Sequence, residues 1–423
     1  MTRPGTAWRH GRIAIAVAAL LLCAANLAFA WPGALTPDSQ SQLQQATSGQ
    51  FNDWHPPFMA MLWRLIGATT PAMLAMQVGL HWLGIWAFAE GARRTRGSAW
   101  PWALLAIGLT PVALKYTAII QKDSLLASLL VLAFGLAFLL PQRAFGWPFG
   151  IAAALCRANG SFALPPLLLE RAHRRVGLAT TVAASLAMAV VLVPAIGAFN
   201  THVLGARETG VQRSVQLFDM AGIAHFSHDD SVLPVGATHA ARCYTPLFWD
   251  ALNRCMAPLA KLKPSLTREW VSAIVRHPLA YAQHRLAHFN RTIFFLVPPM
   301  QQCVDAPAYH SCDVSRRGLI RDAVQKNALL WPVTWLAIGL ALLAAPLDRT
   351  ARALVVSGLL YGFAYAIVGV ASDFRYFYWT ELAIQLALLV QMANVGRIGN
   401  WRSVAASVGA VWLIGYGARW LLA

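Results

Sequence analysis

Residues 37–58 read PDSQSQLQQATSGQFNDWHPPF, a polar stretch that lies between two strongly apolar segments. The chain around it has 423 residues, of which 57% are hydrophobic and only 12% are charged. Soluble proteins carry about 25% charged residues, so the composition predicts an all-α protein that crosses a membrane several times. The quoted stretch is then a loop outside the bilayer, and its polar residues need an explanation.

Apolar runs close to the ~20 residues that a ~30 Å hydrocarbon core requires recur along the chain. We expect spanning segments at 12–30, 72–90, 99–118, 124–140, 177–199, 329–345, 353–371, 378–395 and 403–421. The apolar stretch 147–169 is interrupted by Arg157, Asn159 and Gly160, which predicts a hairpin of two half-helices, because backbone freed at membrane depth must be buried in protein or line a wet cavity. The fold class is thus about nine to eleven transmembrane helices.

The amino terminus carries Arg3, Arg9 and Arg12 before the apolar run 13–29, and residues 28–30 (Ala-Phe-Ala) resemble a signal-peptidase site. The run is also long enough to remain as a signal anchor. Either alternative exports the residues that follow.

Arginine clusters in short loops predict the orientation of the chain. They are Arg93, Arg94 and Arg96; Arg171, Arg174 and Arg175; Arg349 and Arg352; and Arg397 and Arg402. The positive-inside rule assigns these loops to the cytoplasm, which leaves 31–71, 119–123, 200–328 and 372–377 on the opposite face, outside the cytoplasm. Because topology explains the net charge of +17, we expect no nucleic-acid partner.

We therefore divide the chain into an amino-terminal transmembrane module (1–199) with the first external loop 31–71, an external insert (200–328), and carboxy-terminal transmembrane helices (329–423). The insert holds four cysteines, and disulfides are expected in an oxidising compartment. Local pairing of Cys243 with Cys255 and of Cys303 with Cys312 is the simplest of three connectivities, and unpaired thiols are the alternative.

Two further segments of the insert show helical patterns. Residues 268–294 have a helical periodicity that is interrupted at Pro278, which predicts an amphipathic helix on the membrane surface. Residues 212–224 predict a short helix, from which Arg213, Gln216 and Asp219 are candidates to line a cavity. The histidines of the insert lack the further ligands of a zinc site, so we predict no metal there.

The opening stretch begins with a helix start. Thr36 suits the N-cap and Pro37 the first helical position, which puts Asp38 in the first turn, where the helix dipole keeps a carboxylate ionised. Gln42 and Gln45 follow at i+4 and i+7, so one helix face offers a carboxylate and two amides for binding hydroxyl groups. The alternative is that Asp38 only stabilises the helix start.

The same external face collects other charged residues. Asp53 and His55 precede a rigid Pro-Pro, and they belong either to a site or to the bilayer surface. Lys122-Asp123 lies at the junction of two spanning segments. Asp373-Phe374-Arg375-Tyr376 lies just before the expected span 378–395. Charge at membrane depth costs ~2.5 kcal/mol or more, so the cluster indicates a substrate cavity, with snorkelling or mutual neutralisation as the alternative.

Sugar transfer from a polyprenyl-phosphate donor needs such a cluster. A carboxylate removes the proton of an acceptor hydroxyl while cations hold the departing phosphate. A phosphate leaves without being protonated by a general acid. The reaction therefore needs only one base and a group of cations that binds the phosphate.

The order of the motifs resembles the GT-C superfamily of membrane glycosyltransferases, which includes protein O-mannosyltransferases and aminoarabinose transferases. The matching motifs are Pro37-Asp38, Asp53-Trp54-His55-Pro56-Pro57, Gln121-Lys122-Asp123, Cys156-Arg157-Ala158-Asn159-Gly160, Arg276-His277-Pro278-Leu279-Ala280-Tyr281 and Phe374-Arg375-Tyr376. Together they cover most of the chain, although each is short.

The resemblance implies that Asp38 is the catalytic carboxylate, that Lys122 and Arg375 contact phosphate, and that an undecaprenyl-type lipid carries the sugar to a glycan, lipid or protein acceptor. Ser39 stands where the common pattern has a second acid, so Asp53 is a candidate to act as a base together with Asp38. A single Asp also offers few ligands for a metal ion. The remaining candidates for substrate binding are Gln42, His55, Asp123, Arg157, Arg213 and Tyr376.

Two other classes of protein stay open at this point. A transporter or flippase of lipid-linked glycans also has broken helices and buried charge, but related halves are not visible in this sequence. A non-catalytic subunit of an envelope-assembly complex is the other alternative, in which the polar motifs would be incidental.

Overall fold

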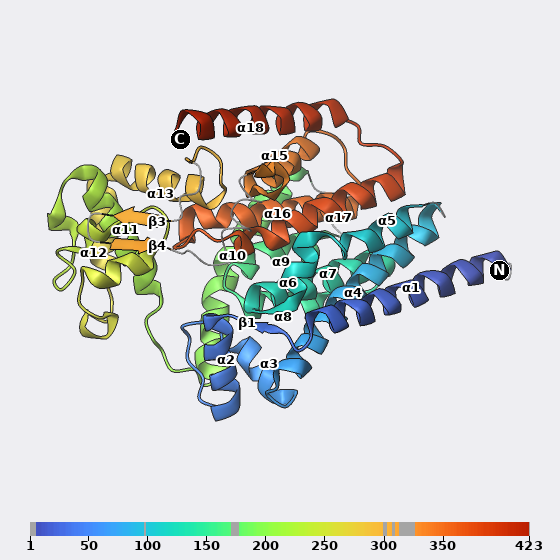
Figure 1. Cartoon of the computed structure of the whole chain (residues 1–423), viewed down its shortest axis with the longest axis horizontal. Coiled ribbons are helices and arrows are strands. Elements are labelled where there is room, and N and C mark those ends of the chain that lie inside the picture. The colour runs from blue at the N-terminus through green and yellow to red at the C-terminus, as the bar shows by residue number, and fades with distance from the viewer. Residues whose placement is uncertain are drawn as a thin grey trace. The chain divides into compact units, whose positions relative to one another are not determined.

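The computed structural model describes residues 6–96, 99–170, 177–298, 303–306, 309–312 and 326–422, and its side chains are described over 11–95, 99–170, 177–298 and 326–422. This part of the chain is almost entirely helical (Figure 1). Six of its helices are long and apolar enough to cross a membrane. They are α1 (Thr6–Ala30), α4 (Thr70–Arg96), α7 (Lys122–Leu139), α10 (Leu178–Ala198), α16 (Arg349–Val368) and α18 (Trp401–Leu421). The predicted fold class, an all-α protein with several membrane spans, is confirmed.

The other expected spans form shorter or less apolar helices. The segment 99–118 is two helices, α5 (Trp100–Ile107) and α6 (Pro111–Ala118), instead of one. The break has a local cause, because Thr110 is extended (ψ 147°) before a proline and its hydroxyl caps the new helix by accepting from the N–H of Ala113. The segments near 329–345 and 378–395 form α15 (Pro332–Leu343) and α17 (Tyr378–Val395).

The predicted hairpin at 147–169 is present as α8 (Trp147–Cys156) and α9 (Gly160–Leu169). Arg157 is extended between them (φ −157°, ψ 134°). A Cβ on Gly160 would lie 2.8 Å from the Cα of Ala154, so glycine is needed for the tight return. The arginine cluster at 171–175 lies outside the described residues.

The chain forms two compact units, described here separately. Unit 1 comprises Met1–Glu208, Gly339–Tyr361 and Arg375–Trp401, and unit 2 comprises Thr209–Ile338, Gly362–Phe374 and Arg402–Ala423. The predicted division at 199 and 329 stays a prediction.

Unit 1 is built around α4 and α7. These helices meet backbone to backbone, since a Cβ on Gly84 would lie 2.5 Å from the backbone nitrogen of Leu132. Near the start of α7, the buried amide of Gln77 donates to the carbonyls of Thr117 and Ile119, each at 3.0 Å. That contact fixes the short strand β2 (Ile119–Ile120), which pairs in parallel with β1 (Ala34–Leu35). Two further helices, α2 (Pro37–Ser48) and α3 (Phe58–Leu65), lie between α1 and α4 in the sequence.

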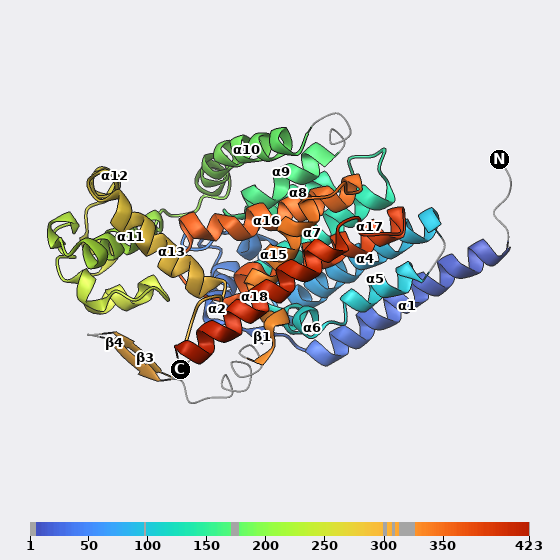
Figure 2. The ribbon, with the colours of Figure 1, turned by 90° about the horizontal axis from the view of Figure 1, so that it is seen from above.

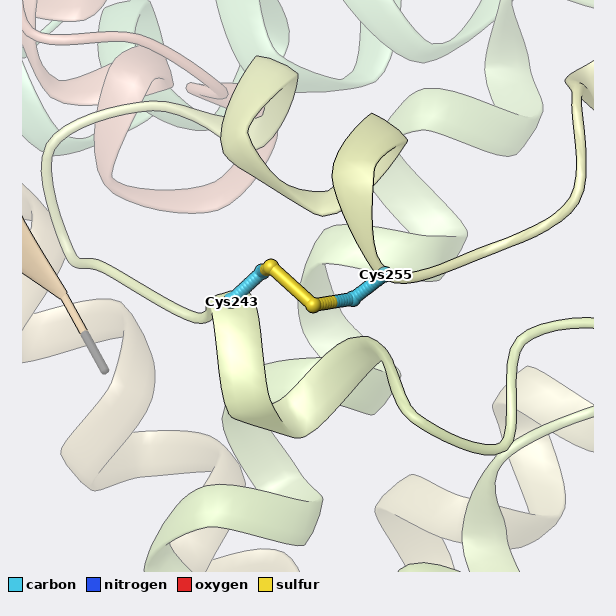
Figure 3. Close-up of a disulfide and its surroundings, with 2 residues drawn as sticks. All are labelled: Cys243 and Cys255. Atoms are coloured by element: carbon cyan, nitrogen blue, oxygen red, sulfur yellow. A yellow bond between two sulfur atoms is a disulfide. The ribbon is translucent and has the colours of Figure 1, made fainter. Parts of the chain in front are cut away.

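Unit 2 contains α11 (Gln212–Ser227), α12 (Thr267–Arg276) and α13 (Pro278–Thr292), which lie side by side in Figure 2. The predicted interruption at Pro278 is confirmed. A disulfide joins Cys243 to Cys255, as local pairing predicted (Figure 3). The hairpin of β3 (Cys303–Ala306) and β4 (Tyr309–Cys312) puts the backbone of Cys303 opposite that of Cys312, but their side chains lie outside the described residues.

The disulfide closes a short loop, with a sequence separation of 12 residues. Replacing both cysteines by serine is expected to destabilise unit 2 by about 3 kcal/mol, because the unfolded chain gains the freedom that the cross-link removes. A lower unfolding temperature of the purified chain, unchanged by added reductant, would be the expected result. The matched control is Cys23→Ser, and an equal effect of that substitution would contradict the prediction.

Asp219 is the buried centre of unit 2. Its side chain is fully buried, and its Oδ2 accepts from Trp270 Nε1 at 2.8 Å. Its Oδ1 is 3.1 Å from His284 Nε2 and also contacts Arg285. Burial lowers the pKa of His284, so the neutral ring donates to Asp219 and accepts from the Tyr244 hydroxyl at 2.9 Å. Asp219 therefore joins α11, α12 and α13 as a fully buried residue.

Replacing Asp219 by asparagine is expected to destabilise unit 2 by about 3–5 kcal/mol, because Arg285 would be left buried without its carboxylate. Thermal unfolding of the purified chain measures this loss. Asp229→Asn is the control, because Asp229 forms an exposed ion pair with His277 at 3.0 Å, and such pairs contribute little. Equal effects of the two substitutions would contradict the assignment.

Candidate active site

The amino terminus of α2 presents Asp38 as the sequence predicted. Thr36 is extended (φ −101°, ψ 166°), and its side chain accepts from the backbone N–H of Ser39 while Ser39 bonds back to the Thr36 N–H. This reciprocal cap fixes the first turn of the helix. Asp38 lies in that turn, near the positive end of the helix dipole.

The β1–β2 ladder brings a second carboxylate beside the first. Leu35 pairs with Ile120, and the third residue after each is an aspartate in the first turn of a helix, Asp38 in α2 and Asp123 in α7. The Ser39 hydroxyl donates to the Ile120 carbonyl and joins the two helix starts. Parallel pairing in this register therefore aligns the two carboxylates.

Two cations contact the same oxygen of Asp38. Lys122 Nζ and an Arg375 guanidinium nitrogen each lie 3.1 Å from its Oδ2. The carboxylate is 28% exposed, whereas Lys122 is 9% and Arg375 18% exposed. Asp38 is thus the accessible member of the group.

His55 completes the surroundings of Asp38. Its Nδ1 lies 2.8 Å from Lys122 Nζ and its Nε2 lies 3.6 Å from Asp38 Oδ1. A protonated lysine only donates, so Nδ1 accepts and the proton is on Nε2, facing the carboxylate. Burial lowers the pKa of His55 in spite of the nearby Asp38, so the ring is neutral at pH 7.

Asp123 contacts two guanidinium groups, those of Arg157 and Arg375. It is 1% exposed, accepts a hydrogen bond from Arg157, and has its Oδ2 3.9 Å from Arg375 Nε. Both guanidinium groups lie over the ring of Tyr376, with carbon-to-centroid distances of 4.5 Å for Arg157 and 5.4 Å for Arg375. The aromatic face adds to the attraction that holds the cations in place.

The site has an excess of positive charge. Lys122, Arg157 and Arg375 face the carboxylates of Asp38 and Asp123. Burial raises the pKa of Asp38, but the His55 hydrogen bond and the charges of Lys122 and Arg375 outweigh it, so the pKa lies far below its ordinary value. One surplus positive charge beside a half-buried, ionised carboxylate suits binding of an anion.

The other candidates make contacts of their own. Gln42 is 1% exposed and its amide lies 3.4 Å from the Pro56 carbonyl, so it supports the loop. Gln45 is also buried, and its Oε1 accepts from the N–H of Asn52 at 2.9 Å. The backbone N–H of Asp53 donates to Arg207 at 3.1 Å. Arg213 belongs to unit 2, where it donates to main-chain carbonyls, including Leu259 at 2.8 Å.

The sequence did not predict the role of two residues that support the site. Gln77 orients β2 and Ser39 joins the two helix starts. An amide within an apolar segment is the signal that marks Gln77, whereas a serine in a helix first turn gives no such signal. Within the described ranges, no group of three or more His, Cys, Asp and Glu side chains is placed to hold a metal ion.

Comparison with known proteins gives one similar structure. No protein-family model and no curated protein matches the chain. The crystal structure of ArnT from Cupriavidus metallidurans bound to undecaprenyl phosphate aligns with 93% of this chain and 79% of its own, at 15% identity and a TM-score of 0.30. A similarity at this level does not define a function.

Proposed function

We propose that this chain is a GT-C-type membrane glycosyltransferase. It moves a sugar from a polyprenyl-phosphate donor to a cell-envelope acceptor on the periplasmic face of the bacterial inner membrane. The observation that carries the proposal is the convergence of Asp38, Lys122 and Arg375, which lie far apart along the chain, around one carboxylate oxygen of Asp38.

In the proposed reaction, the acceptor hydroxyl attacks the anomeric carbon of the sugar. The bond between that carbon and the phosphate oxygen breaks, and the phosphate leaves with the bonding electrons. Asp38 accepts the proton of the hydroxyl. The lipid phosphate gains a negative charge as it leaves, and Lys122 and Arg375 stabilise that charge.

The low pKa of Asp38 makes it a weak base before the donor binds. A bound phosphate attracts the cations that otherwise hold the carboxylate, Lys122 and Arg375. Their attraction to Asp38 is then shared, so the pKa of Asp38 rises towards a value useful for proton transfer. Donor binding thereby activates the base.

Asp123 acts in this proposal as a positioning residue. It is buried and holds Arg157 and Arg375, so those cations keep their places when Asp38 becomes protonated. Asp53 stays the candidate for a second base.

The comparison of envelope glycans from a deletion strain and its parent by mass spectrometry tests the proposal. A missing mass increment that returns with the wild-type gene identifies the sugar and its carrier together. Identical glycans in both strains, grown under conditions in which the protein is made, would count against a transferase. Accumulation of a complete lipid-linked glycan on the cytoplasmic face would favour a flippase instead.

The predicted sidedness is tested by cysteine labelling. Ser48 in the external loop and Thr95 at the end of α4 are both exposed in the structure. A membrane-impermeant maleimide added to intact spheroplasts should label Ser48→Cys and spare Thr95→Cys until the membrane is opened. The reverse pattern would put Asp38 in the cytoplasm and remove the proposed periplasmic reaction.

A further inference from the structure

Helix α12 of unit 2 is held by one face only. On its inner side Trp270 bonds to Asp219 at 2.8 Å, and Thr267 accepts from Gln216 at 3.1 Å. Ala273 on the same side is fully buried. These contacts decide which side chains of α12 point away from the unit.

One edge of the outer face is apolar. Val271 is 47% and Val275 is 73% exposed, and their i, i+4 spacing puts them in one stripe. Leu279 and Leu286 of α13 are 72% and 69% exposed. Exposed large aliphatic side chains that share one helix stripe, such as Val271 and Val275, are typical of a surface that binds a partner or a membrane.

The other edge of the outer face is basic and borders a groove. Arg268, Ser272 and Arg276 are spaced by four residues, and with the turn 231–233 they line a cavity of about 280 Å³. Glu269 also lines the groove, but it is ion-paired with Lys263 at 3.1 Å. Within the described part of the chain, Arg268 and Arg276 form no salt bridge with a carboxylate, so the groove favours an anion.

An anion site beside an exposed aliphatic stripe matches one occupant. A phospholipid supplies a phosphate for the guanidinium groups and acyl chains for the valines, and amphipathic helices use both contacts at an anionic bilayer surface. Free phosphate would fill the groove and leave Val271 and Val275 in water. We infer that α12 docks on anionic lipid, with the headgroup phosphate between Arg268, Ser272 and Arg276 and with the valine stripe in the interface.

This inference does not depend on the proposed sugar transfer. Its test uses the full chain in nanodiscs of phosphatidylcholine, with or without phosphatidylglycerol, and a spin label on Val275→Cys. The label should be accessible to oxygen, which dissolves in the bilayer, and protected from a water-soluble nickel complex. The protection from nickel should be greater in discs that contain phosphatidylglycerol. A label on Thr238→Cys, an exposed loop position of the same unit, should stay open to nickel in both lipids.

The double variant Arg268→Gln/Arg276→Gln should lose the response to phosphatidylglycerol. Arg242→Gln, an exposed arginine on another element, should keep it. Unchanged thermal unfolding separates loss of lipid binding from loss of fold.

Three results would overturn the inference. One is equal exposure to nickel at positions 275 and 238 in both lipids. Another is a lipid response that survives in the double variant. The third is inorganic phosphate reproducing the effect of phosphatidylglycerol in neutral discs, which would assign the groove to free phosphate.

Discussion

Asp38→Asn is expected to lower sugar transfer by about 10³-fold or more, with normal protein level and membrane insertion. The amide keeps the shape of the carboxylate but accepts no proton, and general-base catalysis contributes about 10²–10⁴-fold. The substitution also removes the negative charge that Lys122 and Arg375 share. The measurement is the rate of glycan modification in a deletion strain that carries the variant.

Two variants make this result specific. Asp38→Glu keeps a carboxylate one methylene further out and should retain part of the activity. Asp53→Asn changes the other acid of the segment 31–71 and, if Asp38 is the base, should cost much less than Asp38→Asn. Wild-type transfer in the Asp38→Asn strain would remove this residue from the mechanism, and a larger loss in Asp53→Asn would move the base to that position.

Arg375→Gln is expected to lower kcat/KM for the lipid donor by about 10²–10³-fold. Arg375 is the cation that contacts both carboxylates, at 3.1 Å from Asp38 and 3.9 Å from Asp123. In the proposed reaction, losing it removes a donor to the leaving phosphate, for which an effect of that size is typical. Steady-state rates of the purified protein over a range of donor concentrations measure the loss.

Arg375→Lys is the matched control for that experiment. It keeps the positive charge but not the planar fork that reaches two carboxylates at once, so we expect it to recover part of the loss. Similar kcat/KM values for the wild type and Arg375→Gln would contradict the phosphate contact. Equal losses in the Lys and Gln variants would show that charge alone is not what Arg375 supplies.

The local parts of the site were predictable from the sequence. Thr36-Pro37-Asp38 forms its cap because capping depends on neighbours within one turn. The break at Arg157 likewise follows from a polar interruption in an apolar run. These features needed no knowledge of the rest of the chain.

The contacts between residues far apart along the chain were harder to predict from the sequence. Nothing in Ala34-Leu35 or Ile119-Ile120 marks them as partners, because two apolar residues give no pairing signal. Hydropathy alone joined 99–118 into one span, because it does not register the effect of Pro111 on the residue before it. Gln42 and Gln45 were expected to face outward, but the loop folds back and buries them.

The pairing of Leu35 with Ile120 has a consequence for insertions and deletions. Each aspartate follows its paired residue by the same three positions, so adding or removing one residue between Leu35 and Asp38 would turn the side chain by about 100° around its helix. Natural variants of this protein should therefore tolerate insertions and deletions after Ser48, at the far end of α2. They should not tolerate them between Leu35 and Asp38.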